Sequence, residues 1–254
     1  MVLFLCLGDG GTNFFSRIAE IAKVTLDTPM STESRTDQPI DRDAIRAMRR
    51  SYGESGLHES DALRDPIKQF QSWLEEAAKN VVIVEANAMV LSTIADDKPA
   101  SRTVLLKDVS EEGFSFFTNY GSAKAQQIGI NPQVSLLFPW YAMERQVIIN
   151  GTAKKVAEEI TNEYFASRPW GSQIGAWASS QSEDLDSREV LEVRYKEFSE
   201  KYPQGSSVPT PPHWGGYLVT PQSIEFWQGR YSRLHDRLKY TRGSDAWQIT
   251  RLHP

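Results

Sequence analysis

Arginine and histidine side chains are concentrated in the segment FWQGRYSRLHDR, residues 226–237. If its second half is an extended strand, Arg233, His235 and Arg237 share one face, because alternate side chains of a strand point the same way. Cations placed side by side repel one another unless an anion or an electron-rich ligand lies among them. The adjacent Trp-Gln pair adds a flat apolar surface and an amide, so the set suits a planar polar ring. A solvated strand edge, where cations discourage aggregation, is the alternative.

Two other segments combine cations with hydroxyl groups. SRTVLLK supplies Arg102 and Lys107, whose opposite parity in a regular strand predicts different faces. They would form either two separate anion sites or two strand-end charges that reach water. TNYGSAKA brings Thr118, Ser122 and Lys124 to a turn and a helix start, where free backbone N–H groups attract phosphate. An ordinary capped helix is the alternative there.

The segment EYFASRPWGSQ places Tyr164, Arg168 and Ser172 four residues apart. One face holds all three if the helical pieces on either side of Pro169 are roughly collinear, and a plain helix–helix corner is the alternative. The segment MRRSY, residues 48–52, is either a basic surface or a lid that closes over an anion.

The composition restricts the possible classes of function. The 28 Lys and Arg against 33 Asp and Glu give a net charge of −5, which favours neither nucleic acid nor an anionic membrane. The single cysteine excludes an intramolecular disulfide and fits a reducing compartment, so we expect a cytoplasmic protein. The sequence has no zinc-ligand spacing, phosphate loop, dinucleotide fingerprint or nucleophile elbow, and we expect no metal site. No apolar run approaches the roughly 20 residues of a membrane span.

Short strands of period two must position these side chains. From residue 86 onward they are rich in Val, Ile, Leu and Phe, and the turns between them are too short for helical crossovers, which predicts an antiparallel sheet. Five or six such strands usually form a barrel or sandwich, and the last strands must return to the first sheet. Helical spacing is predicted over residues 41–53, 65–80, 122–130, 156–168, 169–179 and 186–202.

The N-terminal part of the chain is different in character. Residues 1–43 are rich in Ser, Thr, Asp and Pro toward their end, which predicts a flexible segment. Met30 opens a polar stretch typical of a natural N-terminus, so a start site placed too far upstream is an alternative. Residues 44–254 are expected to form a single domain of mainly β structure with packed helices.

Eight segments together resemble the pyridoxamine 5'-phosphate oxidase family. IEFWQGRYSRLHDR is similar to the family's C-terminal motif, and the others follow in the family's order: SRTVLLK, FFTNYGSAKA, NPQVSLLFPW, ERQVIINGTAKKV, YFASRPWGSQIGAWAS, WGGYLVTP and DAWQITRLHP. The resemblance covers about Arg49 to Pro254. It implies an antiparallel FMN-binding split β-barrel, mainly β with helices (α+β), in a homodimer with FMN at the subunit interface.

The resemblance also implies an activity and residues that carry it. Pyridoxamine or pyridoxine 5'-phosphate would be oxidised to pyridoxal 5'-phosphate, with hydride passing from C4' to flavin N5 and O2 reduced to H2O2. FMN would be bound, partly from the partner subunit, by Arg102, Thr103, Val104, Leu105, Leu106, Lys107, Phe117, Thr118, Lys124, Gln146, Gln181, Ser182, Trp227 and Arg237. Substrate would be bound by Arg49, Arg50, Ser51, Tyr52, Lys107, Tyr164, Arg168, Ser172 and Leu234, with Arg233 and His235 as the catalytic pair.

One position departs from the family pattern. An Arg usually precedes the Lys of GSAKA, and Ala123 stands there in this chain. Losing one charge-assisted hydrogen bond to the FMN phosphate costs about 1.5–3 kcal/mol, so we expect weaker FMN retention without loss of function. An FMN-dependent reductase that uses NAD(P)H and a non-catalytic carrier of FMN or pyridoxal phosphate are the rival functions.

Overall fold

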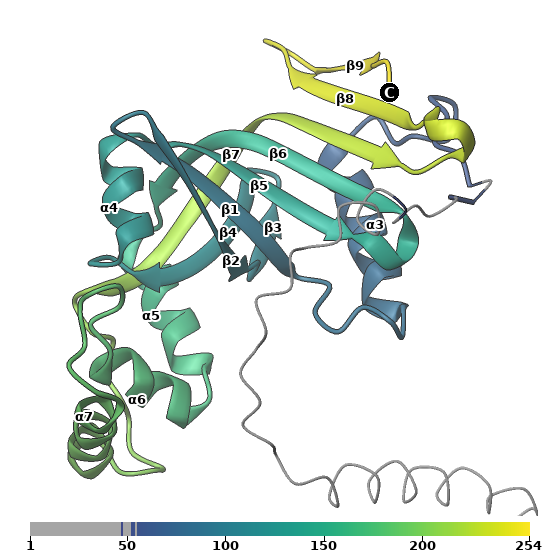
Figure 1. Ribbon diagram of the computed structural model, residues 1–254. Helices are drawn as coiled ribbons and strands as arrows, with labels where there is room; N and C mark the ends of the chain where they lie inside the picture. The colour runs from purple at the N-terminus through teal and green to yellow at the C-terminus, as the bar shows by residue number, and fades with distance from the viewer. Residues whose placement is uncertain (1–46, 48–51, 54) are drawn as a thin grey trace, which may run out of the picture. The chain divides into compact units, whose positions relative to one another are not determined.

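The computed structural model describes residues 47, 52–53 and 55–254 (Figure 1). The chain divides into two compact units, Met1–Arg49 and Arg50–Pro254, and all elements from α3 onward belong to the second. The predicted flexible segment 1–43 lies outside the described residues. So does most of the helix predicted over residues 41–53.

A nine-stranded antiparallel sheet forms the body of the second unit. Its strands are β1 (Ala88–Ala95), β2 (Lys98–Leu105), β3 (Asp108–Ser110), β4 (Gly113–Asn119), β5 (Gln133–Trp140), β6 (Arg145–Lys155), β7 (Trp214–Gln228), β8 (Asp236–Arg242) and β9 (Trp247–Arg251). They are ordered β2-β1-β5-β6-β7-β4-β3, with β8 paired to β7 and β9 to β8. The last strands therefore return to the first sheet, which confirms that prediction.

The sheet differs from the sequence prediction in two respects. No pairing joins its outer strands β2 and β3 within the described residues, so the expected barrel is not closed. The strand β7 is longer than the short strands that were predicted, and it passes Pro221 where the β6–β7 register shifts at Asn150 and Gly151. A side chain at Gly151 would collide with the carbonyl oxygen of Thr220, so glycine permits the close approach at this bulge.

Helix α3 (Pro66–Lys79) covers the core. The Asp65 side chain accepts from the Ile67 N–H at 2.9 Å, and Pro66 occupies the first turn, where its missing N–H costs nothing. The Phe70 ring is fully buried and lies edge-on to Phe114, with ring centroids 4.9 Å apart. Truncating such a phenylalanine to alanine costs about 3–5 kcal/mol, so α3 is a structural rather than a site element.

The other helices gather at one end of the sheet. These are α4 (Ala123–Ile130), α5 (Glu158–Ser167), α6 (Trp170–Ala178) and α7 (Arg188–Lys201). Figure 1 shows α5, α6 and α7 away from β8 and β9, and α4 beside β1 and β2. A separate apolar cluster of Phe165, Ile174, Val208 and Trp214 holds the α5–α6 corner to β7. No helix among the described residues is long and apolar enough to cross a membrane.

Candidate functional site

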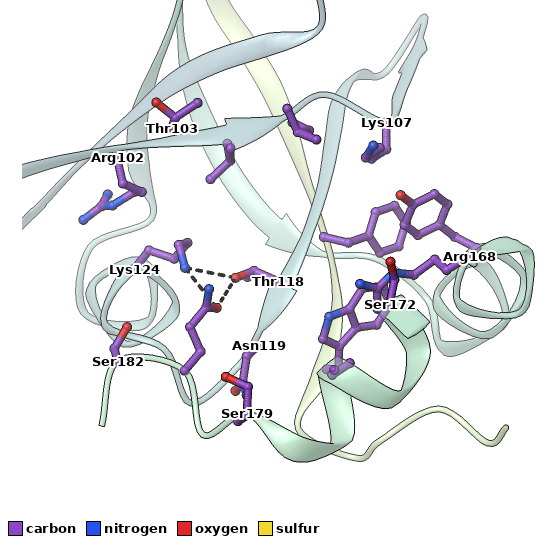
Figure 2. A pocket seen from close by; sticks show the side chains of 18 of the residues that line it. Arg102, Thr103, Lys107, Thr118, Asn119, Lys124, Arg168, Ser172, Ser179 and Ser182 are labelled. Atoms are coloured by element: carbon purple, nitrogen blue, oxygen red, sulfur yellow. Dashed lines mark hydrogen bonds between the residues drawn. The ribbon is translucent and has the colours of Figure 1, made fainter. Parts of the chain in front are cut away.

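A pocket of about 860 Å³ opens between strands β2 and β4 and helices α4, α5 and α6 (Figure 2). Its volume lies in the range of small-molecule sites. Many predicted site residues line it: Arg102, Thr103, Val104, Leu105, Lys107, Phe117, Thr118, Lys124, Tyr164, Arg168, Ser172, Gln181 and Ser182. Within the described residues, no Asp or Glu lines the pocket. The structure thus brings most of the predicted cofactor and substrate contacts into one cationic cavity.

Lys124 is the buried cation at the α4 end of the pocket. Its ammonium donates to Thr118 Oγ1 and Gln181 Oε1, each at 3.1 Å (Figure 2). It also donates to Ser122 Oγ at 3.3 Å. Burial lowers the pKa of Lys124, and the nearby Arg102 lowers it further. All of its acceptors are neutral, so the positive charge has no compensating anion within the described residues.

Arg168 is the corresponding cation at the other end of the pocket, beside Lys107 and Ser172 in Figure 2. Its guanidinium lies 4.6 Å from the centre of the Trp214 ring, and burial lowers its pKa. Its Nη1 atom is buried without a hydrogen-bond partner among the described residues. An unsatisfied buried donor of this kind costs about 1–3 kcal/mol, which a bound oxyanion would offset.

The α5–α6 corner explains how Arg168 reaches the pocket. Arg168 has extended backbone angles, φ −71° and ψ 147°, because the residue before a proline avoids the helical region. Helix α5 therefore stops at Ser167, and the two helices meet at a corner. Tyr164 and Ser172 line the same pocket from either side of this corner, although the helices are not the collinear pieces on which the sequence argument depended.

Arg102 and Lys107 also line this one pocket. The prediction that they lie on different faces of one strand was wrong, because β2 ends at Leu105 and Lys107 lies beyond it. Leu106, a predicted FMN contact, is buried in the hydrophobic core and does not line the pocket.

The segment from Arg233 to Arg237 is not the continuous strand that the sequence predicted. Tyr231–Arg233 form a short 3-10 turn in which Ser232 and Arg233 have φ of 55° and 63°, and β8 begins only at Asp236. Arg233, His235 and Arg237 therefore do not share one face of a strand. Leu234 in this turn is 69% exposed.

His235 and Arg237 belong to a second group, the β7–β8 cluster, here defined as Tyr52, Gln146, Trp227, His235 and Arg237. Trp227 on β7 lies opposite Gln146 on β6 and Arg237 on β8. The His235 ring is 4.7 Å from that of Trp227 and 5.3 Å from that of Tyr52, centre to centre. No member of the cluster lines the pocket of its own chain. The predicted contacts Arg49, Arg50 and Ser51 lie outside the described residues.

Hydrogen bonds define the chemical state of the β7–β8 cluster. The backbone N–H of Arg230 donates to His235 Nδ1 at 3.1 Å, so a neutral imidazole carries its proton on Nε2. Burial lowers the pKa of His235, and Arg233 lowers it further, which favours the neutral ring. Arg237 donates to Glu225 at 2.7 Å, and this bond raises the pKa of Arg237.

Sequence reasoning missed several pocket residues, among them Asn119, Ser179 and Trp214. The Asn119 amide donates to the Ser179 carbonyl at 3.2 Å and ties the end of β4 to the end of α6. Its Oδ1 accepts from the Gly121 N–H at 2.7 Å, a side-chain turn that Asn followed by Tyr-Gly could have signalled. Nothing in the HWGG sequence marks Trp214 as a pocket residue.

Comparison with known proteins gives consistent results. The family model described as pyridoxamine 5'-phosphate oxidase matches residues 74–202, and one described as pyridoxine 5'-phosphate oxidase C-terminal dimerisation region matches residues 214–254. A protein of Streptomyces avermitilis named pyridoxine/pyridoxamine 5'-phosphate oxidase is 49% identical over 222 residues, 84% of this chain and 99% of the relative. One of Rubrobacter xylanophilus with the same name is 52% identical over 211 residues, 83% of this chain and 96% of the relative.

Solved structures confirm the fold. PhzG from Burkholderia lata, in complex with tetrahydrophenazine-1-carboxylic acid, superposes with a TM-score of 0.74 at 28% identity, covering 81% of this chain and all of PhzG (100%). A pyridoxamine 5'-phosphate oxidase-related, FMN binding protein from Nostoc punctiforme has a TM-score of 0.59 at 16% identity and covers 73% of this chain and 97% of its own, which speaks to the fold alone. The predicted architecture of an antiparallel split barrel with packed helices is thus confirmed.

Proposed function

We propose that this chain, which belongs to the pyridoxamine 5'-phosphate oxidase family, is an FMN-dependent oxidase that forms pyridoxal 5'-phosphate. Pyridoxamine 5'-phosphate, O2 and water would give pyridoxal 5'-phosphate, ammonia and H2O2. Pyridoxine 5'-phosphate and O2 would give pyridoxal 5'-phosphate and H2O2. The observation that carries the proposal is one pocket with cations toward both ends and no lining carboxylate among the described residues.

The residues fit two anionic groups, as FMN and a phosphorylated substrate require. Lys124 is a buried ammonium held by neutral oxygens, and Arg168 Nη1 is a buried donor without a partner in the described chain. In our assignment Arg102 and Lys124 hold the FMN phosphate. The substrate phosphate is bound by Lys107, Tyr164, Arg168 and Ser172. When bound, FMN supplies the two-electron acceptor, and the chain supplies binding and orientation.

These side chains bind the substrate phosphate at a distance from the reacting carbon, and this contact fixes the position of the substrate ring. That remote binding energy orients C4' and reduces the entropy that must be lost at the reacting centre. Phe117 stacks on Tyr164, with ring centres 4.0 Å apart, and forms an apolar wall that excludes water between the two cationic ends. The Arg233 and His235 side chains would orient the pyridine ring, and we assign that role to the copies on a partner subunit.

The experiment that tests the proposal is purification of the full chain followed by flavin spectroscopy. We expect a yellow protein whose flavin absorbance bleaches on anaerobic addition of pyridoxamine 5'-phosphate, without any nicotinamide. Readmitted O2 should restore the absorbance and yield one H2O2 per pyridoxal 5'-phosphate. Bleaching that requires NADPH would identify a reductase instead, and bound flavin with no bleaching would identify a carrier.

A further inference from the structure

We infer that Gln127 and Thr93, which do not line the pocket, are positioning residues that hold Arg102 as an uncompensated cation for the FMN phosphate. The inference rests on the proposed function, because it concerns the same pocket. Gln127 lies in α4, one turn after the pocket residue Ala123, and Thr93 lies in β1. The two elements flank β2, which carries Arg102.

Short hydrogen bonds join the three side chains in a ring. Arg102 Nη2 donates to Gln127 Oε1 at 2.7 Å, and Arg102 Nη1 donates to Thr93 Oγ1 at 2.7 Å. The Thr93 hydroxyl donates to the same Gln127 oxygen, also at 2.7 Å. Arg102 Nη1 further reaches the Leu91 carbonyl at 3.2 Å. The Gln127 oxygen thus accepts from both partners, which fixes the orientation of its amide.

These bonds leave donors free for a ligand. A guanidinium carries two hydrogens on each terminal nitrogen and one on Nε. The contacts with Leu91 and Thr93 use both hydrogens of Nη1, and the contact with Gln127 uses one of Nη2. The remaining Nη2 hydrogen and the Nε hydrogen have no hydrogen-bond partner within the described residues. The ring therefore holds the Arg102 plane while leaving two donors for phosphate oxygens.

The side-chain groups that accept hydrogen bonds from Arg102 are neutral, so they do not cancel its charge. A carboxylate at position 127 could hold Arg102 as firmly, but it would cancel the charge, as Glu225 does for Arg237 at 2.7 Å. Gln127 and Thr93 orient the guanidinium and leave its charge whole. Because Ala123 adds no cation to this end of the pocket, phosphate binding there depends on Arg102 and Lys124.

The test compares the binding of FMN and of riboflavin, which lacks the phosphate. The full-length chain, freed of flavin, is titrated with each ligand, and the quenching of flavin fluorescence gives Kd. Gln127→Glu would cancel the Arg102 charge, and Gln127→Leu would remove a hydrogen bond that orients the guanidinium. For both variants we expect the Kd for FMN to rise about tenfold or more. The Kd for riboflavin should change less than about twofold.

The matched controls are Gln126→Glu and Gln126→Leu. Gln126 is the exposed neighbour on α4, and its amide donates to the Gly121 carbonyl at 3.0 Å. Both controls should leave the ratio of the two Kd values unchanged. The leucine variant at 127 adds no charge, so it carries the test if the glutamate variant fails to fold.

Equal weakening of FMN and riboflavin by the Gln127 variants would reduce Gln127 to a packing role and overturn the inference. An unchanged FMN affinity in the Gln127 variants would also overturn the inference. If the wild-type chain then binds FMN and releases peroxide, the proposed function still stands. A wild-type chain that binds neither FMN nor riboflavin would overturn the proposed function together with the inference.

Discussion

The partners of the pocket cations differ from those of other arginines in the chain. Arg145 and Arg237 each donate to a carboxylate, at 2.6 Å and 2.7 Å. Arg102 and Lys124 donate only to neutral oxygens among the described residues, and Arg168 lies over aromatic rings with one nitrogen unpartnered. An unpaired charge that is removed from water raises the free energy of the folded protein. We propose that anionic groups of the ligand are the missing partners at this site.

His235 is predicted to act as a hydrogen-bond donor rather than as a base. Its Nδ1 accepts the Arg230 N–H, so Nε2 carries the proton of the neutral ring, and we propose that this proton is donated to the ligand. His235→Gln can place an amide N–H where Nε2 lies, and we expect its kcat to fall by less than about tenfold. Removal of a general base would lower kcat by about 10²–10⁴. Steady-state kinetics of the full chain measure this difference.

His235→Asn is the control, because its shorter amide corresponds in position to Nδ1 and cannot replace the Nε2 donor. It should lose more activity than the glutamine variant.

The pH profile gives a second check. The pKa of His235 lies below its ordinary value. Protonation keeps the Nε2 donor but removes the Nδ1 acceptor of the Arg230 N–H, which orients the ring. Wild-type kcat/KM should therefore fall only as the pH drops through that lowered pKa, and this limb should vanish in His235→Gln. Equal losses in both variants would contradict a donor role.

Ala123→Arg should tighten FMN binding. Ala123 is exposed and lines the pocket directly before Lys124, so an arginine there can reach a phosphate held at the α4 end. A further charge-assisted hydrogen bond contributes about 1.5–3 kcal/mol, or roughly tenfold or more in Kd. Fluorescence titration with FMN measures it, with Gln126→Arg as the control for added charge on the same helix. An unchanged Kd would show that position 123 does not face the FMN phosphate.

At the scale of elements, the sequence predicted well the features that depend on residues close together in the chain. The helices α3 to α7 and most strands fall where residue spacing placed them. Apolar spacing explains this for α3 to α6, which bury side chains, whereas α7 has no buried residue. Segments with Lys and Arg beside hydroxyl groups were predicted to bind phosphate, and residues of these segments line the pocket. Thirteen residues between Arg102 and Ser182 were expected at the site and line the pocket.

The positions where strands end, and contacts between residues distant in sequence, account for what the sequence did not predict. The strand argument failed at Lys107 because β2 ends two residues earlier, and at Arg233 because positive φ values turn the chain. The hydrophobic periodicity of the sequence marks neither the end of β2 nor the turn at Arg233. The support of Arg102 by Thr93 and Gln127 joins three separate elements, and side-chain hydrogen bonds over such separations leave no local pattern.

The strands β8 and β9 fasten the segment that follows Tyr52. Arg251 on β9 donates to both carboxylate oxygens of Glu59 at 2.7 Å and to Asp236 at 2.6 Å. Its Nη2 also donates to the Leu57 carbonyl at 2.8 Å. A bidentate pair within a network is the geometry in which a surface ion pair contributes to stability. We infer that this network holds the segment that carries Tyr52 near His235.

Glu59→Gln should therefore destabilise the folded chain in a pH-dependent way. The hydrogen bond from Arg251 lowers the pKa of Glu59 to about 2 from its ordinary value of 4.5. A depressed pKa gives stabilisation that is complete above the ordinary value and disappears as the pH falls through the lowered one. Urea midpoints should be lower for Glu59→Gln than for wild type at pH 6, and the gap should close as the pH falls toward about 2.

Glu112→Gln is the control, since Glu112 is an exposed carboxylate in the turn between β3 and β4. It should follow the wild-type curve at each pH. If Glu59→Gln and wild type had the same urea midpoint at pH 6, the network would have no role in fastening the segment.

At the scale of the whole molecule, the site residues fall into two groups on one chain. The pocket holds the phosphate-binding candidates, and the β7–β8 cluster holds Trp227, His235 and Arg237 without lining the pocket. These three members of the cluster lie within residues 214–254, the part that matches a C-terminal dimerisation region. We infer that the cluster of one subunit completes the pocket of the other in a homodimer.

Subunit complementation tests a shared site directly. Arg168→Ala removes a pocket residue and His235→Ala removes a cluster residue, so each homodimer should have little activity. In a mixed dimer, one site would combine both defects and the other would have neither. Random assembly of equal amounts gives half mixed dimers, each with one intact site of two, so co-expression should restore about 25% of wild-type activity. Sites contained within single subunits would give no restoration, because every pocket would then keep one defect.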